Sequence, residues 1–439
     1  MPAVSVVIPA YNHASFLAQT ITSALSQTWR DFEVVVVDDG STDATSQIAT
    51  QFGDAIHYVR QDNQGIAAAR NTGIRHARGE LISFLDDDDL WDPDHLGMVV
   101  PVFQDSYTMA VYTGWQAIDE NDRRLPRGST RVVPPEQLYD ALLVGGFFTG
   151  ACVTVRRTCL DRVGLFDEAL HGCDDLDLWL RISRLQKFKG IPQVLVLYRM
   201  HGGGLSSNEL HMFKDRLKVL GKHFGTDEGD RHSWSDEKRR AFGFAYRSGA
   251  MGHIQQGQLD QGWHLLAQAV EIYPHLLERL DTFYEMVCGD QPRGYRGQAS
   301  LLDMSAKGAE MLMRVDGLFA TADLAVQRLR PAAYGNCHLA LAMLADQAED
   351  WASARKYLLA AMRYYPALLK DVRVLRRFLK FGEARQHVAR LGIACIGRLE
   401  QDRLITLHDQ WVGRIWHAGS ALHFEFESLE WHCTHSECV

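Results

Sequence analysis

The first 113 residues alternate short apolar runs with segments of helical period, and this alternation restricts the fold more than any other feature of the sequence. The strand-like runs are Val4–Pro9, Phe32–Asp39, Ile56–Arg60, Leu81–Asp86 and Met109–Gly114. Helix-like segments at 14–27, 43–52 and 65–77 lie between them. Apolar strands separated by helices predict a parallel sheet covered on both faces. We therefore expect an α/β domain whose ligands bind beyond the carboxyl ends of the strands.

The remaining sequence predicts the end of this domain and a helical one after it. Gly150–Arg157 and Val194–Met200 have strand character and flank a short helix, Asp174–Leu185. Apolar residues surround that helix, which predicts burial, and acids occupy its first turn. From about residue 208 the pattern is helical only. A chain of 439 residues fits two domains, and we expect an α/β domain over 1–207 and an all-helical domain over 208–439.

Two segments of the helical region are similar to each other. Gly249–Leu277 and Leu339–Leu369 align with Pro274 on Pro366. Each resembles the helix pair of tetratricopeptide repeats, but two copies are fewer than the roughly three that a self-supporting array needs. The alternative is generic packing of helices.

Composition and charge exclude several classes of protein. The net charge of −9 argues against a protein that coats nucleic acid. The sequence has no basic and apolar leader and no apolar run near the roughly 18 residues that span a bilayer, which predicts a soluble, cytoplasmic protein. An amphipathic aromatic segment at 410–426 leaves peripheral membrane contact open.

Cysteine usage indicates reduced thiols, because eight cysteines are scattered without the spacing of a disulfide framework. Near the carboxyl terminus, two cysteines lie close to two histidines in the sequence. This set is a candidate zinc site made of His432, Cys433, His435 and Cys438. The alternative is an ordinary terminal tail.

Four consecutive carboxylates, Asp86–Asp89, follow the fourth apolar run. Neighbouring like charges repel by about 1–4 kcal/mol per pair, so such a run needs a cationic partner. If the segment is extended, Asp86 and Asp88 share one face, and two carboxylates at a strand end suit a hard divalent cation. The alternative is a solvated acidic turn that caps a helix starting near Pro93.

Three segments together resemble the successive signatures of family 2 glycosyltransferases with the GT-A fold. They read VSVVIPAYNHASFLAQTITSALSQTWRDFEVVVVDDGSTDAT, NQGIAAARNTGIRHARGELISFLDDDDLWDPDHL and GLFDEALHGCDDLDLWLRI. The resemblance covers about residues 3 to 206, roughly half of the chain. It implies a GT-A domain, a Rossmann-like mixed sheet that binds a nucleotide-diphosphate sugar.

The resemblance implies a nucleotide site made by Pro9, Tyr11, Asp39 and Arg70, which would hold the base and ribose. The residue types agree with that role: a tyrosine ring stacks on a base, an aspartate accepts from a base N–H, and an arginine offers a planar fork. Each also has an ordinary explanation, since Arg70 fits a surface helix position and Tyr11 a partly buried loop.

The resemblance also places a metal site in the acidic run, where Asp86, Asp87 and Asp88 match the family's Asp-X-Asp motif. Asp88 would ligate Mn²⁺ or Mg²⁺, Asp86 would support the ion directly or through water, and Asp87 would touch the ribose. His201, after the last strand, would complete the metal shell or contact phosphate. Such an ion neutralises the leaving diphosphate.

The acidic pair Asp174–Asp175 matches the family's catalytic acids, although the family usually has Glu at the first position. Asp175 is the expected general base for the acceptor hydroxyl. The helix amino terminus lowers its pKa, whereas burial and Asp174 raise it. The alternative is that these acids only complement the helix dipole.

The predicted function is metal-dependent, inverting transfer of a sugar from a nucleotide-diphosphate donor, expected to be UDP-linked, in polysaccharide or glycoconjugate synthesis. The acceptor is a hydroxyl of a saccharide, a lipid-linked saccharide or a protein. The helical domain would recognise the acceptor, self-associate or touch a membrane. One rival is a scaffold protein with a degenerate transferase half. A second is a nucleotidyltransferase, which would carry a Gly-rich basic loop where this chain has PAYNHASF.

Overall fold

The computed structural model describes residues 1–204, 208–289, 291, 299–320 and 322–370, which pack as two compact units. The first unit holds Met1–Leu277 and two later segments, and the second holds most of the described chain after that point. Helices immediately after residue 207 therefore pack in the same unit as the sheet. The predicted domain boundary at residue 207 stays a prediction.

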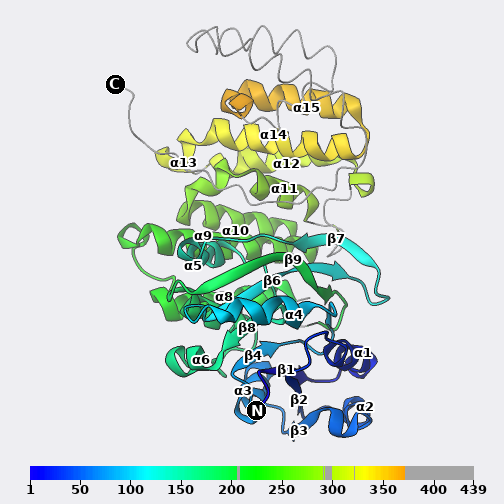
Figure 1. The fold of residues 1–439 in the computed structure, drawn as a ribbon. Helices are drawn as coiled ribbons and strands as arrows, with labels where there is room; N and C mark the ends of the chain where they lie inside the picture. The colour runs from blue at the N-terminus through cyan, green and yellow to red at the C-terminus, as the bar shows by residue number, and fades with distance from the viewer. Residues whose placement is uncertain (205–207, 290, 292–298, 321, 371–439) are drawn as a thin grey trace, which may run out of the picture. The chain divides into compact units, whose positions relative to one another are not determined.

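One mixed sheet forms the centre of the first unit (Figure 1). In the described part of the chain its order is β3-β2-β1-β4-β8-β6-β9-β5, and β7 pairs with β6. The strands are β1 Val4–Ala10, β2 Phe32–Asp39, β3 His57–Gln61, β4 Leu81–Phe84, β5 Leu90–Trp91, β6 Ala110–Ile118, β7 Arg124–Ser129, β8 Val153–Arg156 and β9 Phe188–Arg199.

Strand directions confirm the predicted α/β fold class with a mixed sheet. Strands β1 to β4 pair in parallel, as their continuous apolar sequences predict. Strand β8 enters antiparallel between β4 and β6, and β6 and β9 again run in parallel. The carboxyl ends of β1, β2, β4, β6 and β9 consequently lie at one edge, where the polar residues that follow them meet.

Helices cover the sheet, and in Figure 1 α3 lies to one side of β1–β3 with α1 and α2 on the other. Helix α3 packs closely on β1 because Gly73 has no side chain: a Cβ there would lie 2.3 Å from Cγ1 of Val7. The helices of this unit's main segment are α1 Ala14–Leu25, α2 Thr45–Thr50, α3 Ile66–His76, α4 His95–Val99, α5 Pro135–Val144, α6 Arg157–Val163, α7 Asp174–Ser183, α8 Glu209–Phe224, α9 Asp236–Gln255 and α10 Leu259–Ile272.

The described residues after Leu277 form helices, as predicted for that part of the chain. Its helices are α11 Leu280–Cys288, α12 Met304–Phe319, α13 Leu324–Arg328, α14 Arg330–Gln347 and α15 Trp351–Tyr364. Within the described residues, no helix is both long enough and apolar enough to cross a bilayer. The terminal cluster at 432–438 and the segment 410–426 lie outside the described residues.

The two similar segments form equivalent helical hairpins, α9–α10 and α14–α15. In the first, Gly243 approaches Cβ of Tyr273 so closely that an added Cβ would lie 2.5 Å from it. In the second, Gly335 approaches Cβ of Tyr365 in the same way, at 2.3 Å. Glycine and tyrosine therefore make one close helix contact in both hairpins, a packing feature the sequence alignment alone did not reveal.

Candidate active site

The acidic run is a turn at the end of β4, not an extended strand. Leu85 still donates a backbone hydrogen bond to Val7, but Asp89 then donates to the carbonyl of Asp86 at 3.1 Å. This corrects the expectation that Asp86 and Asp88 share a face by strand alternation. Because the backbone turns, the four carboxylates diverge and each meets a different partner.

Asp86 points toward a buried arginine. Arg70, on α3, is 4% exposed. Its Nη2 lies 2.6 Å from Oδ1 of Asp86 and its Nη1 lies 2.7 Å from Oδ2 of Asp174. Burial opposes the charge, but Asp86 and Asp174 raise the pKa of Arg70 above its ordinary value. Arg70 is therefore not an ordinary surface residue: its guanidinium joins the acidic turn to the acidic pair.

The acidic pair begins α7, as predicted. Cys173 precedes it in the left-handed region with φ of 56°, a conformation that a non-glycine residue rarely adopts. Asp174 is buried against Arg70, whereas Asp175 is only partly buried. Burial, and then the charge of Asp174, raise the pKa of Asp175 to about 6. The forces that raise this pKa outweigh the helix amino terminus, and Asp175 can accept a proton near neutral pH.

Asp87 turns toward the end of β1. Its Oδ2 accepts a hydrogen bond from the backbone N–H of Tyr11 at 2.9 Å, and its Oδ1 lies 2.8 Å from Nδ1 of His13. The hydrogen bond with Asp87 raises the pKa of His13 to about 9, and burial raises the pKa of Asp87 to about 6. Both oxygens of Asp87 thus have protein partners, and its predicted ribose contact stays a prediction.

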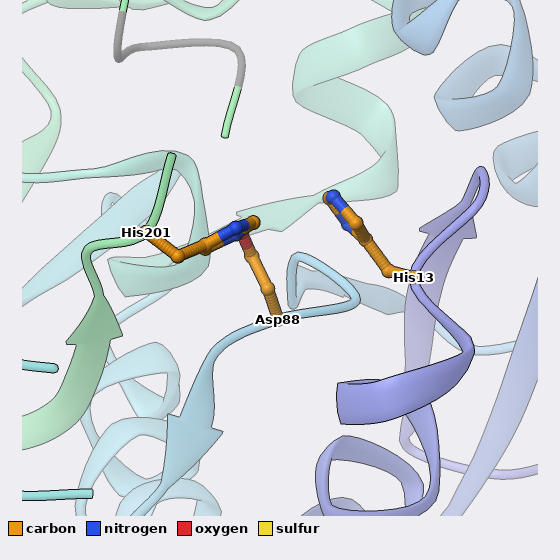
Figure 2. Close-up of side chains that lie close together, drawn as sticks. All are labelled: His13, Asp88 and His201. Atoms are coloured by element: carbon orange, nitrogen blue, oxygen red, sulfur yellow. The ribbon is translucent and has the colours of Figure 1, made fainter. Parts of the chain in front are cut away.

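Asp88 contacts His201, the residue that sequence placed after the last strand. Its Oδ2 lies 2.9 Å from Nε2 of His201, and the rings of His201 and His13 are 5.1 Å apart edge to face. Figure 2 shows the three side chains converging from the ends of different strands. One ligand atom of each, from His13, Asp88 and His201, lies within 4.8 Å of the others. These residues make a candidate site for a divalent cation.

Asp89 is an internal structural acid. It is fully buried, and its Oδ1 accepts a hydrogen bond from the backbone N–H of Arg199 at 2.8 Å. Burial, and then the charge of Asp88, raise the pKa of Asp89 well above its ordinary value, which favours the neutral acid. Arg199 also donates from Nε to the carbonyl of Asp88 at 2.8 Å. Arg199, at the end of β9, therefore holds the acidic turn through two hydrogen bonds.

The predicted nucleotide residues lie at the ends of β1 and β2. Pro9 is buried within β1, whereas Tyr11 is 45% exposed. Asp39 is nearly buried, and its Oδ1 and Oδ2 accept the backbone N–H groups of Gln64 and Gly65 at 2.9 and 2.8 Å. Asp39 thus orders the loop before α3, and its predicted contact with a base stays a prediction.

Residues 5–164 match the family model described as Glycosyl transferase family 2. An uncharacterized glycosyltransferase of Rickettsia typhi is 32% identical over 224 residues, which is 49% of this chain and 69% of that protein. The chain belongs to glycosyltransferase family 2. Chondroitin synthase of Escherichia coli is 32% identical over 226 residues, 50% of this chain but only 32% of that protein.

Solved structures similar to this family 2 chain are more distant in sequence. Staphylococcus aureus TarS 1–349 in complex with UDP-GlcNAc is 16% identical with a TM-score of 0.43, and the match covers 75% of this chain and 90% of that one. A mannosyltransferase from Pyrobaculum calidifontis in complex with GDP-Man and Mn²⁺ is 20% identical with a TM-score of 0.44, and the match covers 82% and 86%.

The donor set of this family 2 chain fits a divalent cation. Carboxylate and imidazole are the groups that bind such ions, and three of them converge from three strand ends. Sequence reasoning named Asp88 and His201 but missed His13. A signal was present, because His13 follows β1 at the same sheet edge as the acidic run. Asp86 faces Arg70 instead, and its predicted role as a metal ligand stays a prediction.

Proposed function

We propose that this chain is an inverting glycosyltransferase that moves a sugar from a nucleotide-diphosphate donor, UDP-linked, to a hydroxyl acceptor in polysaccharide or glycoconjugate synthesis. The observation that carries the proposal is the bridge by Arg70 between Asp86, in the turn with the candidate metal ligand Asp88, and Asp174, beside Asp175. The bridge supports the proposal because it links the turn that would hold the diphosphate to the helix that carries the proposed proton acceptor. Family membership supports the same reaction class.

In the proposed reaction Asp175 acts on the acceptor. Its carboxylate takes the proton of the acceptor hydroxyl as that oxygen bonds to the anomeric carbon. The bond from the anomeric carbon to the diphosphate oxygen breaks, and the nucleotide diphosphate leaves with that electron pair. One displacement on the face opposite the leaving group inverts the sugar. Asp174 is held in an ion pair with Arg70, so Asp175 is the acid of the pair that is available as base.

The other half of the proposed site holds the donor. Tyr11 offers an exposed ring for the base, and Asp39 holds the loop at the amino end of α3. His13, Asp88 and His201 would hold a divalent ion, Mn²⁺ or Mg²⁺, which when bound supplies charge neutralisation for the diphosphate. Arg70 keeps Asp86 turned away from the ligand atoms of this set.

Acceptor and location are further parts of the proposal. We place the reaction in the cytoplasm, with the helical region recognising a saccharide, lipid-linked saccharide or protein acceptor, self-associating, or touching the membrane face. The names of relatives such as chondroitin synthase and hyaluronan synthase support a saccharide acceptor. The chain spans less than a third of either relative, so their whole activities do not transfer to it.

A screen of nucleotide sugars tests the proposal. Thermal shift with and without Mn²⁺ identifies a donor, and release of nucleotide diphosphate with a saccharide acceptor measures transfer. We expect Asp175→Asn to bind the donor as the wild type does and to lose transfer. Asp161→Asn, an exposed acid on α6, is the matched control and keeps both. If no nucleotide sugar shifts the melting temperature with any metal, the scaffold alternative replaces this proposal.

A further inference from the structure

We propose that His13 is a third protein ligand of the cation, and that two imidazoles with one carboxylate make the site selective for a transition ion such as Mn²⁺ over Mg²⁺. The inference rests on the proposed function for the purpose of the ion, but its geometry stands alone. It changes the ligand set expected from sequence, which was Asp86, Asp88 and His201.

The convergence of the three side chains is the first observation. His13 lies between β1 and α1, Asp88 follows β4, and His201 follows β9, yet their ligand atoms are within 4.8 Å of one another (Figure 2). Ligands of one divalent transition ion lie about 2.0–2.2 Å from it and hence at most about 4.4 Å apart. Small side-chain rotations therefore suffice for all three to reach one ion.

The contact between His13 and Asp87 is the second observation. Metal-binding histidines almost always donate their other ring N–H to a carboxylate, carbonyl or water, which fixes the ring and its tautomer. Nδ1 of His13 lies 2.8 Å from Oδ1 of Asp87, and Asp87 is itself held by the backbone N–H of Tyr11. This arrangement leaves Nε2 of His13 as the nitrogen for a cation, which competes there with a proton.

An apolar side chain supports both imidazoles. The ring of Phe16, on α1, lies 4.9 Å from the ring of His201 and 6.2 Å from that of His13. The guanidinium of Arg199 packs 4.8 Å from the centre of the same ring. Phe16 therefore packs against both histidines on one side, and such apolar surroundings limit solvent access to a metal site.

The position of Asp86 decides between the two ligand sets. With Asp86 the site would have two carboxylates, an oxygen-rich set that suits Mg²⁺. Asp86 is instead held by Nη2 of Arg70 at 2.6 Å and does not belong to the converging group. Imidazole suits transition ions, whereas Mg²⁺ favours oxygen ligands and keeps its waters. The set His13, Asp88 and His201 therefore favours a transition ion over Mg²⁺, and Mn²⁺ is the transition ion used here as the probe.

Metal binding by the full chain, without nucleotide, tests the inference. Mn²⁺ is titrated into metal-stripped protein by calorimetry and by electron paramagnetic resonance, and pulsed spectra report the coupled imidazole nitrogens. We expect two coupled imidazoles in the wild type, and one in His13→Ala. Mn²⁺ affinity should fall by about tenfold to a hundredfold in Asp87→Asn, and at least as far in His13→Ala. His57→Ala, an exposed histidine on β3, is the matched control.

Selectivity is measured by competition. In the wild type we expect a large excess of Mg²⁺ to be needed to displace Mn²⁺, and a smaller excess in His13→Ala. His13→Asn serves as a second variant, and circular dichroism confirms that each is folded. The inference is overturned if His13→Ala and His13→Asn keep wild-type Mn²⁺ affinity and two coupled imidazoles, or if Mg²⁺ displaces Mn²⁺ at equal concentration. Failure of the nucleotide-sugar screen would remove the proposed function and leave these metal results standing.

Discussion

Nη1 of Arg70 lies 2.7 Å from Oδ2 of Asp174, although the two residues are 104 positions apart in the chain. The same guanidinium reaches Asp86 at 2.6 Å through its other terminal nitrogen. One buried cation thus holds an acid from each of the two clusters. The planar fork of arginine suits this bridge, because a lysine offers a single point of charge.

Replacing Arg70 should be costly for stability. Arg70→Met leaves the buried Asp174 and the mostly buried Asp86 without a cation, and we expect a loss of about 3–5 kcal/mol in the free energy of unfolding. Urea denaturation measures the loss. Arg75→Met on the same helix is the control, because Arg75 and Glu168 form an exposed pair expected to contribute less than about 1 kcal/mol. Equal losses in the two variants would contradict the bridge.

The pKa of Asp175 predicts the pH dependence of transfer. A general base must be ionised, and burial with Asp174 raises its pKa to about 6, so kcat/KM should fall as the pH drops through about 6. The folded-state pKa lies above the ordinary value of 3.8. The folded state therefore loses stability through this group as the pH rises from about 3.8 to 6. Asp175→Asn should therefore abolish transfer while gaining stability relative to the wild type at pH 7. A rate profile flat from pH 5 to 8 would exclude Asp175 as the base.

Much of the sheet could be predicted from sequence because its strands are continuous apolar runs. The predicted range Phe32–Asp39 is the observed β2. Strand β7, with the sequence RLPRGS, was missed because proline and glycine argue against a strand and only its pairing at the edge with β6 permits one. Strand β5 has two residues, too few for any periodic signal.

The candidate site was less predictable, because partners in space decide the role of each acid. The sequence does not distinguish the roles of four consecutive aspartates. In the structure Asp86 pairs with Arg70, whereas Asp89 accepts a hydrogen bond from the backbone of Arg199. Local sequence also could not show that α8, beyond the expected boundary at residue 207, packs in the same unit as α7. Such contacts depend on segments far apart in the chain.

Asp89 should tolerate loss of its charge but not loss of its acceptor. Because the wild type holds a neutral acid that ionises in the unfolded chain, Asp89→Asn should be at least as stable as the wild type at pH 7. Asp89→Leu leaves the backbone N–H of Arg199 unpaired and should be about 1–3 kcal/mol less stable than Asp89→Asn. The stability linked to the raised pKa is lost as the pH rises, so the Asn variant should compare better with the wild type at pH 8 than at pH 5. Thermal denaturation at both pH values checks this. A large loss in Asp89→Asn alone would show that the carboxylate is ionised.

Asp177 should stabilise the helix that carries Asp175. It is fully buried, with Arg181, Lys222 and His223 at 2.9, 3.1 and 3.2 Å, so it joins α7 to α8. Burial alone would raise its pKa, but the hydrogen bond with His223 and the charges of Arg181 and Lys222 hold the pKa below the ordinary value of 3.8. We expect Asp177→Asn to lose about 3–5 kcal/mol in the free energy of unfolding at pH 7, because the charges of Arg181 and Lys222 then face a neutral group.

The pH dependence of that loss separates an ionic role from simple packing. With a lowered folded-state pKa, the stabilisation is present above about pH 3.8 and is lost as the pH falls further, so the gap between wild type and Asp177→Asn should narrow between pH 4 and pH 2.5. Urea midpoints at pH 7, 4 and 2.5 measure the gap. Asp161→Asn, the exposed acid on α6, should show no gap at any of them. A gap of the same size at pH 7 and 2.5 would mean that Asp177 acts through shape, and its charge would then have no part in holding α7 on α8.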